Sequence, residues 1–173
     1  MSDWSLRLAR PQDAEHFAVI EEAADHLFKD IPELEKFAAG GSWMGPERYR
    51  RLIAKGHSLV AFRNDQPIGF IATEPFRREL HVWQLSVHAE AQRLGIGSGL
   101  VRACMIDARN CGFVAITLTT FRDLAWNAPF YEKLGFEEVS ALDAHPRLAG
   151  ELALEADKGL PMERRCAMIR FLD

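Results

Sequence analysis

The sequence has few of the features that mark metal, membrane or nucleic-acid proteins. Its three cysteines, Cys104, Cys111 and Cys166, form no C-x-x-C pair and no zinc-ligand spacing. No apolar run approaches the roughly 20 residues of a membrane span, and the first residues contain no apolar signal-peptide core. The net charge of −4 argues against a general nucleic-acid or anionic-membrane binder. We therefore expect a cytoplasmic protein with no metal, no nucleic-acid partner and no membrane partner.

Two common phosphate-binding patterns are also missing. No Gly-Lys pair followed by Ser or Thr is present, so the chain has no P-loop. A dinucleotide fingerprint needs the spacing G-x-G-x-x-G after the first strand, whereas Gly95, Gly97 and Gly99 alternate in the middle of the chain. The sequence therefore excludes a P-loop and a dinucleotide-binding fingerprint, and a phosphate site in this chain would need another glycine spacing.

What the chain does contain is a glycine-rich turn that opens an amphipathic helix. A strand is expected to end at Val87, and apolar residues then recur at the helical period from Ile96 to Cys111. The first amides of a helix have no intrahelical partner and lie at its positive end. Glycines at 95, 97 and 99 leave that backbone uncovered, and Arg93 adds a positive charge. We interpret the turn as a diphosphate site; the alternative is a turn that only packs a helix on a strand.

The pattern of the remaining chain predicts one three-layer α/β domain over residues 1–173. Strands are expected over 4–9, 58–63, 68–73, 80–87, 114–118, from Phe136 and over 165–172. Helices are expected over 11–28, from Pro46, over 96–111 and over 128–134. An irregular stretch is expected before Pro46, and a surface helix and loop over 144–163. Cys104 and Cys111 fall in the central helix as expected small core residues.

Two motifs together resemble the GNAT superfamily of N-acetyltransferases. Gln92–Gly97 fits the pattern Q/R-x-x-G-x-G/A, and Asn127–Phe136 resembles the family's Asn, Tyr and Gly-Phe segment after the fifth strand. With the element order, the resemblance covers essentially the whole chain. It implies a mixed central sheet of about six or seven strands flanked by about four helices, with splayed fourth and fifth strands. It also implies acetyl-CoA as co-substrate.

The resemblance further implies roles for particular residues. Leu85, Ser86 and Val87 match fourth-strand positions whose backbone pairs with the pantetheine arm. The pyrophosphate loop is matched by Gln92, Arg93, Leu94, Gly95, Ile96, Gly97 and Ser98. Asn127 matches a polar residue that contacts the CoA arm, and it could also only cap a helix. Tyr131 matches the general acid that protonates the leaving thiolate; the alternative is a core aromatic.

The identity of the general base stays open. Many relatives carry Glu at the position of Gln84, which cannot ionise. His81 aligns roughly with the catalytic Glu of histone-type members, and a histidine could accept a proton directly or through water. The alternative is an exposed or hydrogen-bonded strand histidine.

We predict acetyl transfer to a primary amine of a small molecule, such as an amino acid, a polyamine or an amine drug, by direct attack in a ternary complex. The alternatives are a protein or peptide N-acetyltransferase, a non-catalytic acetyl-CoA-binding module and a nucleotide-binding protein. Glu21, Glu22, Asp25 and Asp30 could attract a cationic amine, but we prefer a solvated helix face. Relatives often pair, which allows a homodimer.

Overall fold

The computed structural model describes residues 3–38, 40 and 42–173. Close contacts divide the chain into two compact units: residues up to Glu74 with Gln84–Asp107, and Pro75–Trp83 with Ala108–Asp173. The expectation of a single domain over 1–173 therefore stays a prediction. Among the described residues, no helix is both long enough and apolar enough to cross a bilayer.

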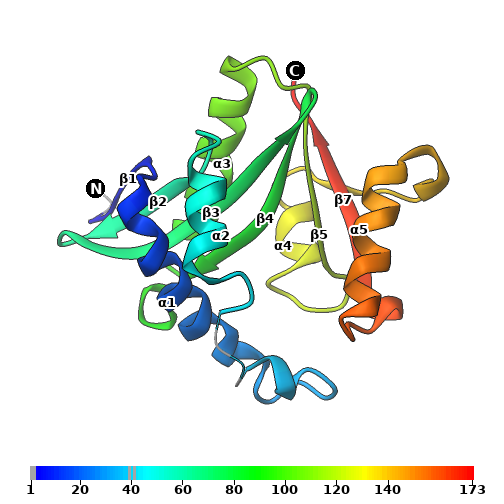
Figure 1. Cartoon of the computed structure of the whole chain (residues 1–173), viewed down its shortest axis with the longest axis horizontal. Coiled ribbons are helices and arrows are strands. Elements are labelled where there is room, and N and C mark those ends of the chain that lie inside the picture. Colours follow the sequence, from blue (N-terminus) through cyan, green and yellow to red (C-terminus); the bar gives the residue numbers. More distant parts are fainter. Residues whose placement is uncertain (1–2, 39, 41) are drawn as a thin grey trace. The chain divides into compact units, whose positions relative to one another are not determined.

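The strands form the mixed α/β sheet that the sequence predicts (Figure 1). In the part of the chain that is described, seven strands follow the hydrogen-bonded order β1-β2-β3-β4-β5-β7-β6. They are β1 (Ser5–Leu8), β2 (Leu59–Arg63), β3 (Gln66–Phe76), β4 (Glu79–Val87), β5 (Ala115–Phe121), β6 (Glu137–Glu138) and β7 (Arg165–Phe171). The β4–β5 pair is parallel, whereas β5–β7 and β6–β7 are antiparallel.

Five α-helices lie within the described ranges, one more than the expected number. They are α1 (Ala14–Asp25), α2 (Gly45–Ile53), α3 (Ile96–Asn110), α4 (Ala128–Glu132) and α5 (Pro146–Asp157). Short 3₁₀ turns occupy Pro11–Asp13, His26–Phe28, Glu35–Phe37, Ala89–Ala91, Leu142–Ala144 and Met162–Arg164. The first two continue α1 at both ends, which confirms the helical stretch predicted over 11–28.

In the first unit, alternation along β3 explains how helices pack on both faces of a strand. Phe70 stacks on Phe17 of α1, with ring centroids 4.1 Å apart. The next residue back, Gly69, faces α3, where a Cβ would lie only 3.2 Å from Ile96 and 3.4 Å from Leu100. Successive strand residues point to opposite faces. The Phe70 ring therefore packs against α1 on one face of β3, and Gly69 lets α3 approach the other face.

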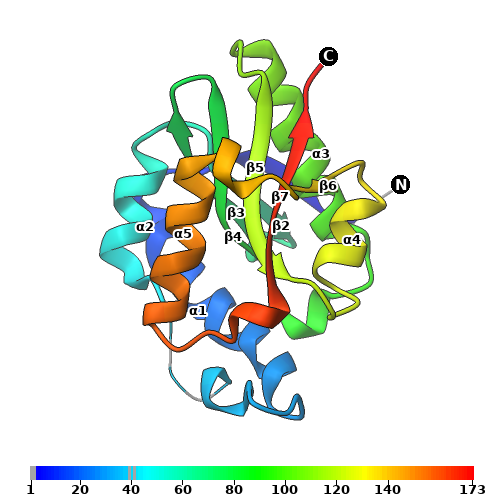
Figure 2. The same cartoon turned by 90° about the vertical axis from the view of Figure 1, so that its right-hand side faces the viewer.

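In the second unit, α5 is more than the surface helix that the sequence suggests. Leu148 and Leu152 are buried against Ala167 of β7, and Figure 2 shows α5 alongside that strand. The strand β5 also extends three residues beyond the predicted end at Leu118, because Thr119, Thr120 and Phe121 pair with β7. Such pairing joins residues more than 40 positions apart and leaves no local pattern in the sequence.

The register between β4 and β5 stops before either strand ends. In the described structure it runs from Glu79 opposite Ala115 to Val82 opposite Leu118, although β4 continues to Val87 and β5 to Phe121. This early end to the pairing agrees with the predicted splay of the fourth and fifth strands.

The prediction that the acidic residues of α1 form a solvated face is wrong for two of them. Glu21 is fully buried and accepts hydrogen bonds from the Ser42 hydroxyl, from the Trp43 backbone N–H at 2.9 Å and from the Tyr49 hydroxyl at 2.6 Å. Asp25, one turn later, is 7% exposed. The α2 helix and the chain before it cover this side of α1, which a helical pattern alone does not reveal. Glu22 and Asp30 are exposed as expected.

Asp25 differs from Glu21 because its charge is not compensated. Its Oδ2 atom is buried and has no hydrogen-bond partner within the described residues. Burial, assisted by the carboxylates of Glu21 and Glu22, raises the pKa of Asp25 from 3.8 to about 7. Among the cysteines, Cys104 is buried as expected, whereas Cys111, just beyond α3, is exposed and corrects that prediction.

We expect Asp25→Asn to change how the free energy of unfolding depends on pH. The folded protein keeps a proton on Asp25 that the unfolded chain loses above pH 3.8, so the contribution of Asp25 to wild-type stability falls as pH rises from about 4 to about 7. The difference between variant and wild type should grow over that interval by up to about 4 kcal/mol in favour of the variant. Urea unfolding at pH 4, 6 and 8 measures it. The exposed Asp30→Asn serves as control; parallel profiles for wild type and Asp25→Asn would contradict the expectation.

Candidate active site

The turn between β4 and α3 has two residues in left-handed backbone conformations and open space at one of them. Arg93 and Gly95 have positive φ angles of 63° and 77°, and a Cβ at Gly95 would meet no atom within 4 Å. The Gly99 N–H bonds to the Gly95 carbonyl at 2.9 Å, at the first turn of α3. The amides of residues 95–98 precede that bond, so they include the groups that a helix leaves without an internal partner. The positive end of the helix dipole lies at the same place.

Several side chains of the turn stabilise the turn itself. The Gln92 amide donates to the Val87 carbonyl at 3.2 Å, and the Ser98 hydroxyl donates to the Gly95 carbonyl at 3.3 Å. Ile96 is buried, while Arg93 and Leu94 are exposed. The side chains of Gln92, Ile96 and Ser98 therefore fix the loop, and its backbone is the part left to meet a ligand.

Gly99 does not fit the predicted role of uncovering the backbone for an anion. A Cβ at this position would collide with the Trp4 Cη2 atom and lie 3.2 and 3.3 Å from two further ring carbons. Glycine is needed here because the indole of a distant residue packs on the helix. No local sequence pattern links Trp4 to Gly99, because 95 positions separate the two residues.

The end of β4 presents two polar side chains that bind each other. The Gln84 amide donates to the Ser86 hydroxyl at 3.0 Å, and Ser86 is 4% exposed. Leu85 and Val87 are half-buried. Because a glutamine amide does not titrate, this strand end carries no carboxylate at the position where the resemblance expects a base.

Asn127 precedes α4 but does not cap it with its side chain. Its Oδ1 atom instead accepts a hydrogen bond from the Thr120 hydroxyl at 2.6 Å and a longer one from the Phe121 N–H at 3.5 Å. The interpretation of Asn127 as a simple cap is therefore wrong. With Oδ1 engaged by the end of β5, a contact to a ligand would use the amide nitrogen.

Tyr131 lies on α4 between two aromatic rings. Its ring centroid is 5.1 Å from that of Phe130 and 5.5 Å from that of Phe136, and the residue is 8% exposed. Burial raises the pKa of the Tyr131 phenol above its ordinary value, and the Arg165 guanidinium opposes this effect. The hydroxyl thus keeps its proton at neutral pH, as a proton donor must.

His81 is held in a buried polar network of the second unit. Its Nδ1 atom lies 2.9 Å from the Thr117 hydroxyl and 3.1 Å from Arg147 Nη1, and Arg147 also donates to Glu79 at 2.7 Å. Since arginine only donates, Nδ1 must accept, and we assign the ring proton to Nε2. Burial, with Arg147 and His145 nearby, lowers the pKa of His81 from 6.5 to about 3. These contacts favour the hydrogen-bonded strand histidine.

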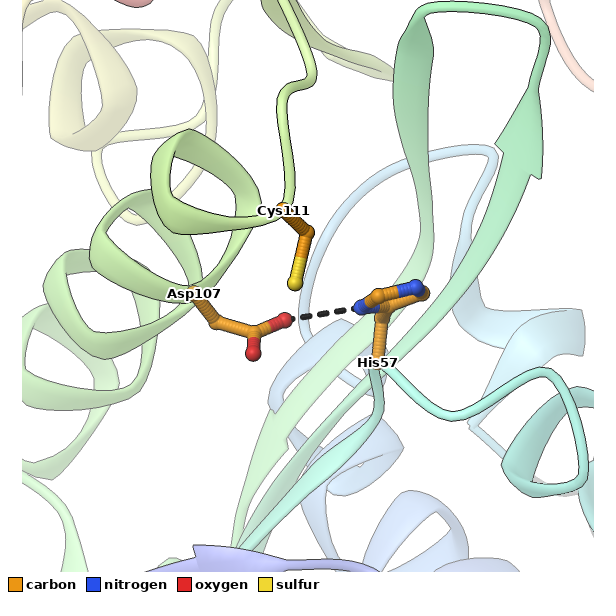
Figure 3. Close-up of side chains that lie close together, drawn as sticks. All are labelled: His57, Asp107 and Cys111. Atoms are coloured by element: carbon orange, nitrogen blue, oxygen red, sulfur yellow. Dashed lines mark hydrogen bonds and ion pairs between the residues drawn. The ribbon is translucent and has the colours of Figure 1, made fainter.

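The predicted site residues thus fall into two groups. The β4 end and the turn, residues 84–98, lie together in the first unit, whereas His81, Asn127 and Tyr131 belong to the second. The first unit also contains a hydrogen bond that no local sequence pattern indicates: His57 Nδ1 is 2.8 Å from Asp107 Oδ2 of α3 (Figure 3). Arg147 and Thr117 were missed as well, because no local motif links them to His81.

Comparison with known proteins connects this geometry to a family. A model of the acetyltransferase (GNAT) family matches residues 18–136. PaiA N-acetyltransferase from Thermoplasma acidophilum, solved with coenzyme A, has a TM-score of 0.69 and 15% identity over 97% of this chain and 98% of that one. Arabidopsis thaliana Naa50, solved with the bisubstrate analogue CoA-Ac-MVNAL, has a TM-score of 0.63 and 18% identity over 96% and 97%.

A third similar structure belongs to a longer protein. N-acetylglutamate synthase from Neisseria gonorrhoeae, complexed with coenzyme A and N-acetyl-glutamate, has a TM-score of 0.68 and 19% identity over 98% of this chain but 35% of that one. At these identities the structures show a common fold. The family match establishes membership of the family as well as the fold, because it covers more than half of the chain. The matched residues include the turn, β4, β5 and α4. The chain therefore belongs to the GNAT acetyltransferase family and is an N-acetyltransferase enzyme that uses acetyl-CoA.

Proposed function

We propose that this enzyme transfers the acetyl group of acetyl-CoA to the primary amine of a small molecule, by direct attack in a ternary complex. The observation that carries the proposal is the uncovered turn at the start of α3, with Arg93 and Gly95 in left-handed conformations. A non-glycine residue rarely adopts that conformation without a reason, and such strain gathers at functional sites.

The turn supports a role in holding the CoA diphosphate. Backbone N–H groups of residues 95–98 and the helix dipole offer a positive surface that needs no side chain. The Arg93 side chain is exposed and adds a full positive charge. At Gly95, the absence of any atom around a Cβ position leaves room for a ligand to approach the main chain. We assign Gln92, Ile96 and Ser98 to loop support, and Leu94 and Gly97 to the loop backbone.

The strand before the turn supports binding of the pantetheine arm. The backbone groups of Leu85, Ser86 and Val87 follow the point where the β4–β5 register ends, at Val82. Backbone groups on the β5 side of β4 beyond this point lie outside the described β4–β5 register, and the amide-rich pantetheine arm would supply hydrogen-bond partners for them. A backbone N–H at this strand end could also stabilise the oxyanion formed during acetyl transfer.

Tyr131 is proposed as the general acid. The amine nitrogen attacks the thioester carbon, the tetrahedral oxyanion collapses, the C–S bond breaks, and the sulfur takes the phenolic proton. The amine loses its proton to solvent, and solvent reprotonates the phenolate. Burial of the phenol keeps it protonated until that step. Asn127 would contact the CoA arm through its amide nitrogen.

For His81 the contacts support a holding role. A histidine whose pKa is about 3 is neutral at physiological pH, and its Nδ1 lone pair is already occupied by Thr117 and Arg147. We therefore propose that His81 ties β4 to β5 and Arg147, and that it does not serve as the general base.

Small amines and peptides both enter the test of the acceptor class. One similar structure is complexed with N-acetyl-glutamate and another with a peptide-containing bisubstrate analogue. We place small amines first and keep protein or peptide acetylation as the alternative. A cytoplasmic location and a homodimer stay predictions.

Tyr131→Phe should lower kcat by about 100-fold or more, the usual contribution of a general acid. It should leave the Kd for acetyl-CoA within about twofold, because the ring and its packing are kept. Steady-state kinetics and calorimetric titration measure the two quantities. The control is Tyr49→Phe, which removes the other tyrosine hydroxyl of the chain, bonded to Glu21; it should cost stability and spare kcat. Full turnover by Tyr131→Phe would remove the acid assignment.

An acceptor screen tests the proposed substrate class. Free thiol released from acetyl-CoA is followed with polyamines, amino acids, aminoglycosides and short peptides. We expect turnover with at least one small amine, at a kcat/KM above that of every peptide. Faster turnover with peptides would favour the alternative, and thiol release independent of any amine would contradict acetyl transfer to nitrogen.

A further inference from the structure

Trp4 contacts the phosphate-binding turn at two points although it precedes it by about 90 residues. Its indole Nε1–H donates to the Leu94 carbonyl at 3.3 Å, and its ring packs on Gly99 so closely that a Cβ there would collide with it. Trp4 stands immediately before β1, whose Ser5 pairs with Phe62 of β2. The indole therefore links the sheet to both sides of the turn.

The hydrogen bond fixes the orientation of one peptide group. The Leu94 carbonyl and the Gly95 N–H belong to the same planar, trans peptide, so they point in opposite directions. Holding the carbonyl against the indole directs the Gly95 N–H away from Trp4. Gly95, with φ of 77° and open space around its α-carbon, could otherwise turn this peptide over at little steric cost.

The ring contact fixes the start of the helix in the same way. Gly99 donates its N–H to the Gly95 carbonyl at 2.9 Å, and the Trp4 indole packs against the α-carbon of Gly99. Movement of this first turn would shift the Gly95 carbonyl and the amides that follow it. The two contacts thus hold residues 94–99 as a unit.

We propose that Trp4 is a positioning residue that presets the turn for the diphosphate of CoA. The inference rests on the proposed function of the turn, and Trp4 would act through its contacts with Leu94 and Gly99. Its contacts order the turn before CoA binds, so the entropic cost of ordering the turn does not reduce the affinity for the nucleotide end of CoA.

The test compares Trp4→Phe with wild type by calorimetric titration with CoA and with pantetheine, which has the same arm and thiol but no diphosphate. Phenylalanine keeps an aromatic ring and removes the N–H donor. We expect the Kd for CoA to rise about three- to tenfold, the worth of one hydrogen bond, and the Kd for pantetheine to stay unchanged. Gly99→Ala, which displaces the indole, should raise the same Kd selectively.

Leu8→Ala provides the control, because Leu8 is 51% exposed and lies at the other end of β1, the strand that Trp4 precedes. It should leave both Kd values unchanged. Equal weakening of CoA and pantetheine by Trp4→Phe, or no weakening at all, would overturn the positioning role while leaving the turn as a diphosphate site. If wild type itself bound the two ligands equally, the diphosphate assignment would fail, and the role of Trp4 with it.

Discussion

The proposed diphosphate site depends on the first backbone amides of α3. Every helix begins with N–H groups that have no internal partner, and a Ser, Thr, Asp or Asn side chain before the helix can bind one of them. Here the left-handed residues Arg93 and Gly95 lead into the helix, and the nearby Ser98 hydroxyl bonds to a carbonyl rather than to an amide. The helix start therefore keeps its capacity to bind an anion, and the surrounding structure holds it in place.

That support comes from ordinary packing. Gly69 lets α3 approach β3 closely, with Ile96 and Leu100 seated over it. Phe70, on the opposite face of the same strand, stacks against α1. A strand that is covered on both faces cannot shift without opening a cavity, so the packing on β3 holds α3, the helix that follows the turn, in place.

The buried titratable groups differ in how many hydrogen-bond partners surround them. Glu21 accepts three hydrogen bonds and joins α1 to the chain around α2. His81 is fixed as a neutral ring by Thr117 and Arg147. Asp25 is buried without such partners, and its pKa rises accordingly. Compensation by neighbours, more than residue type, decides what each group can do.

The sequence alone determined the element order, the turn at residues 92–98 and the position of Tyr131, because helical periodicity, glycine spacing and local motifs are encoded within short stretches. Only the tertiary structure decided that Glu21 and Asp25 are buried, that Asn127 binds Thr120, that His81 faces Arg147 and that Trp4 covers Gly99. Each of these depends on which distant segment packs alongside, and short-range patterns carry no information about that choice. Buried polar groups must then find partners among whatever neighbours the fold provides.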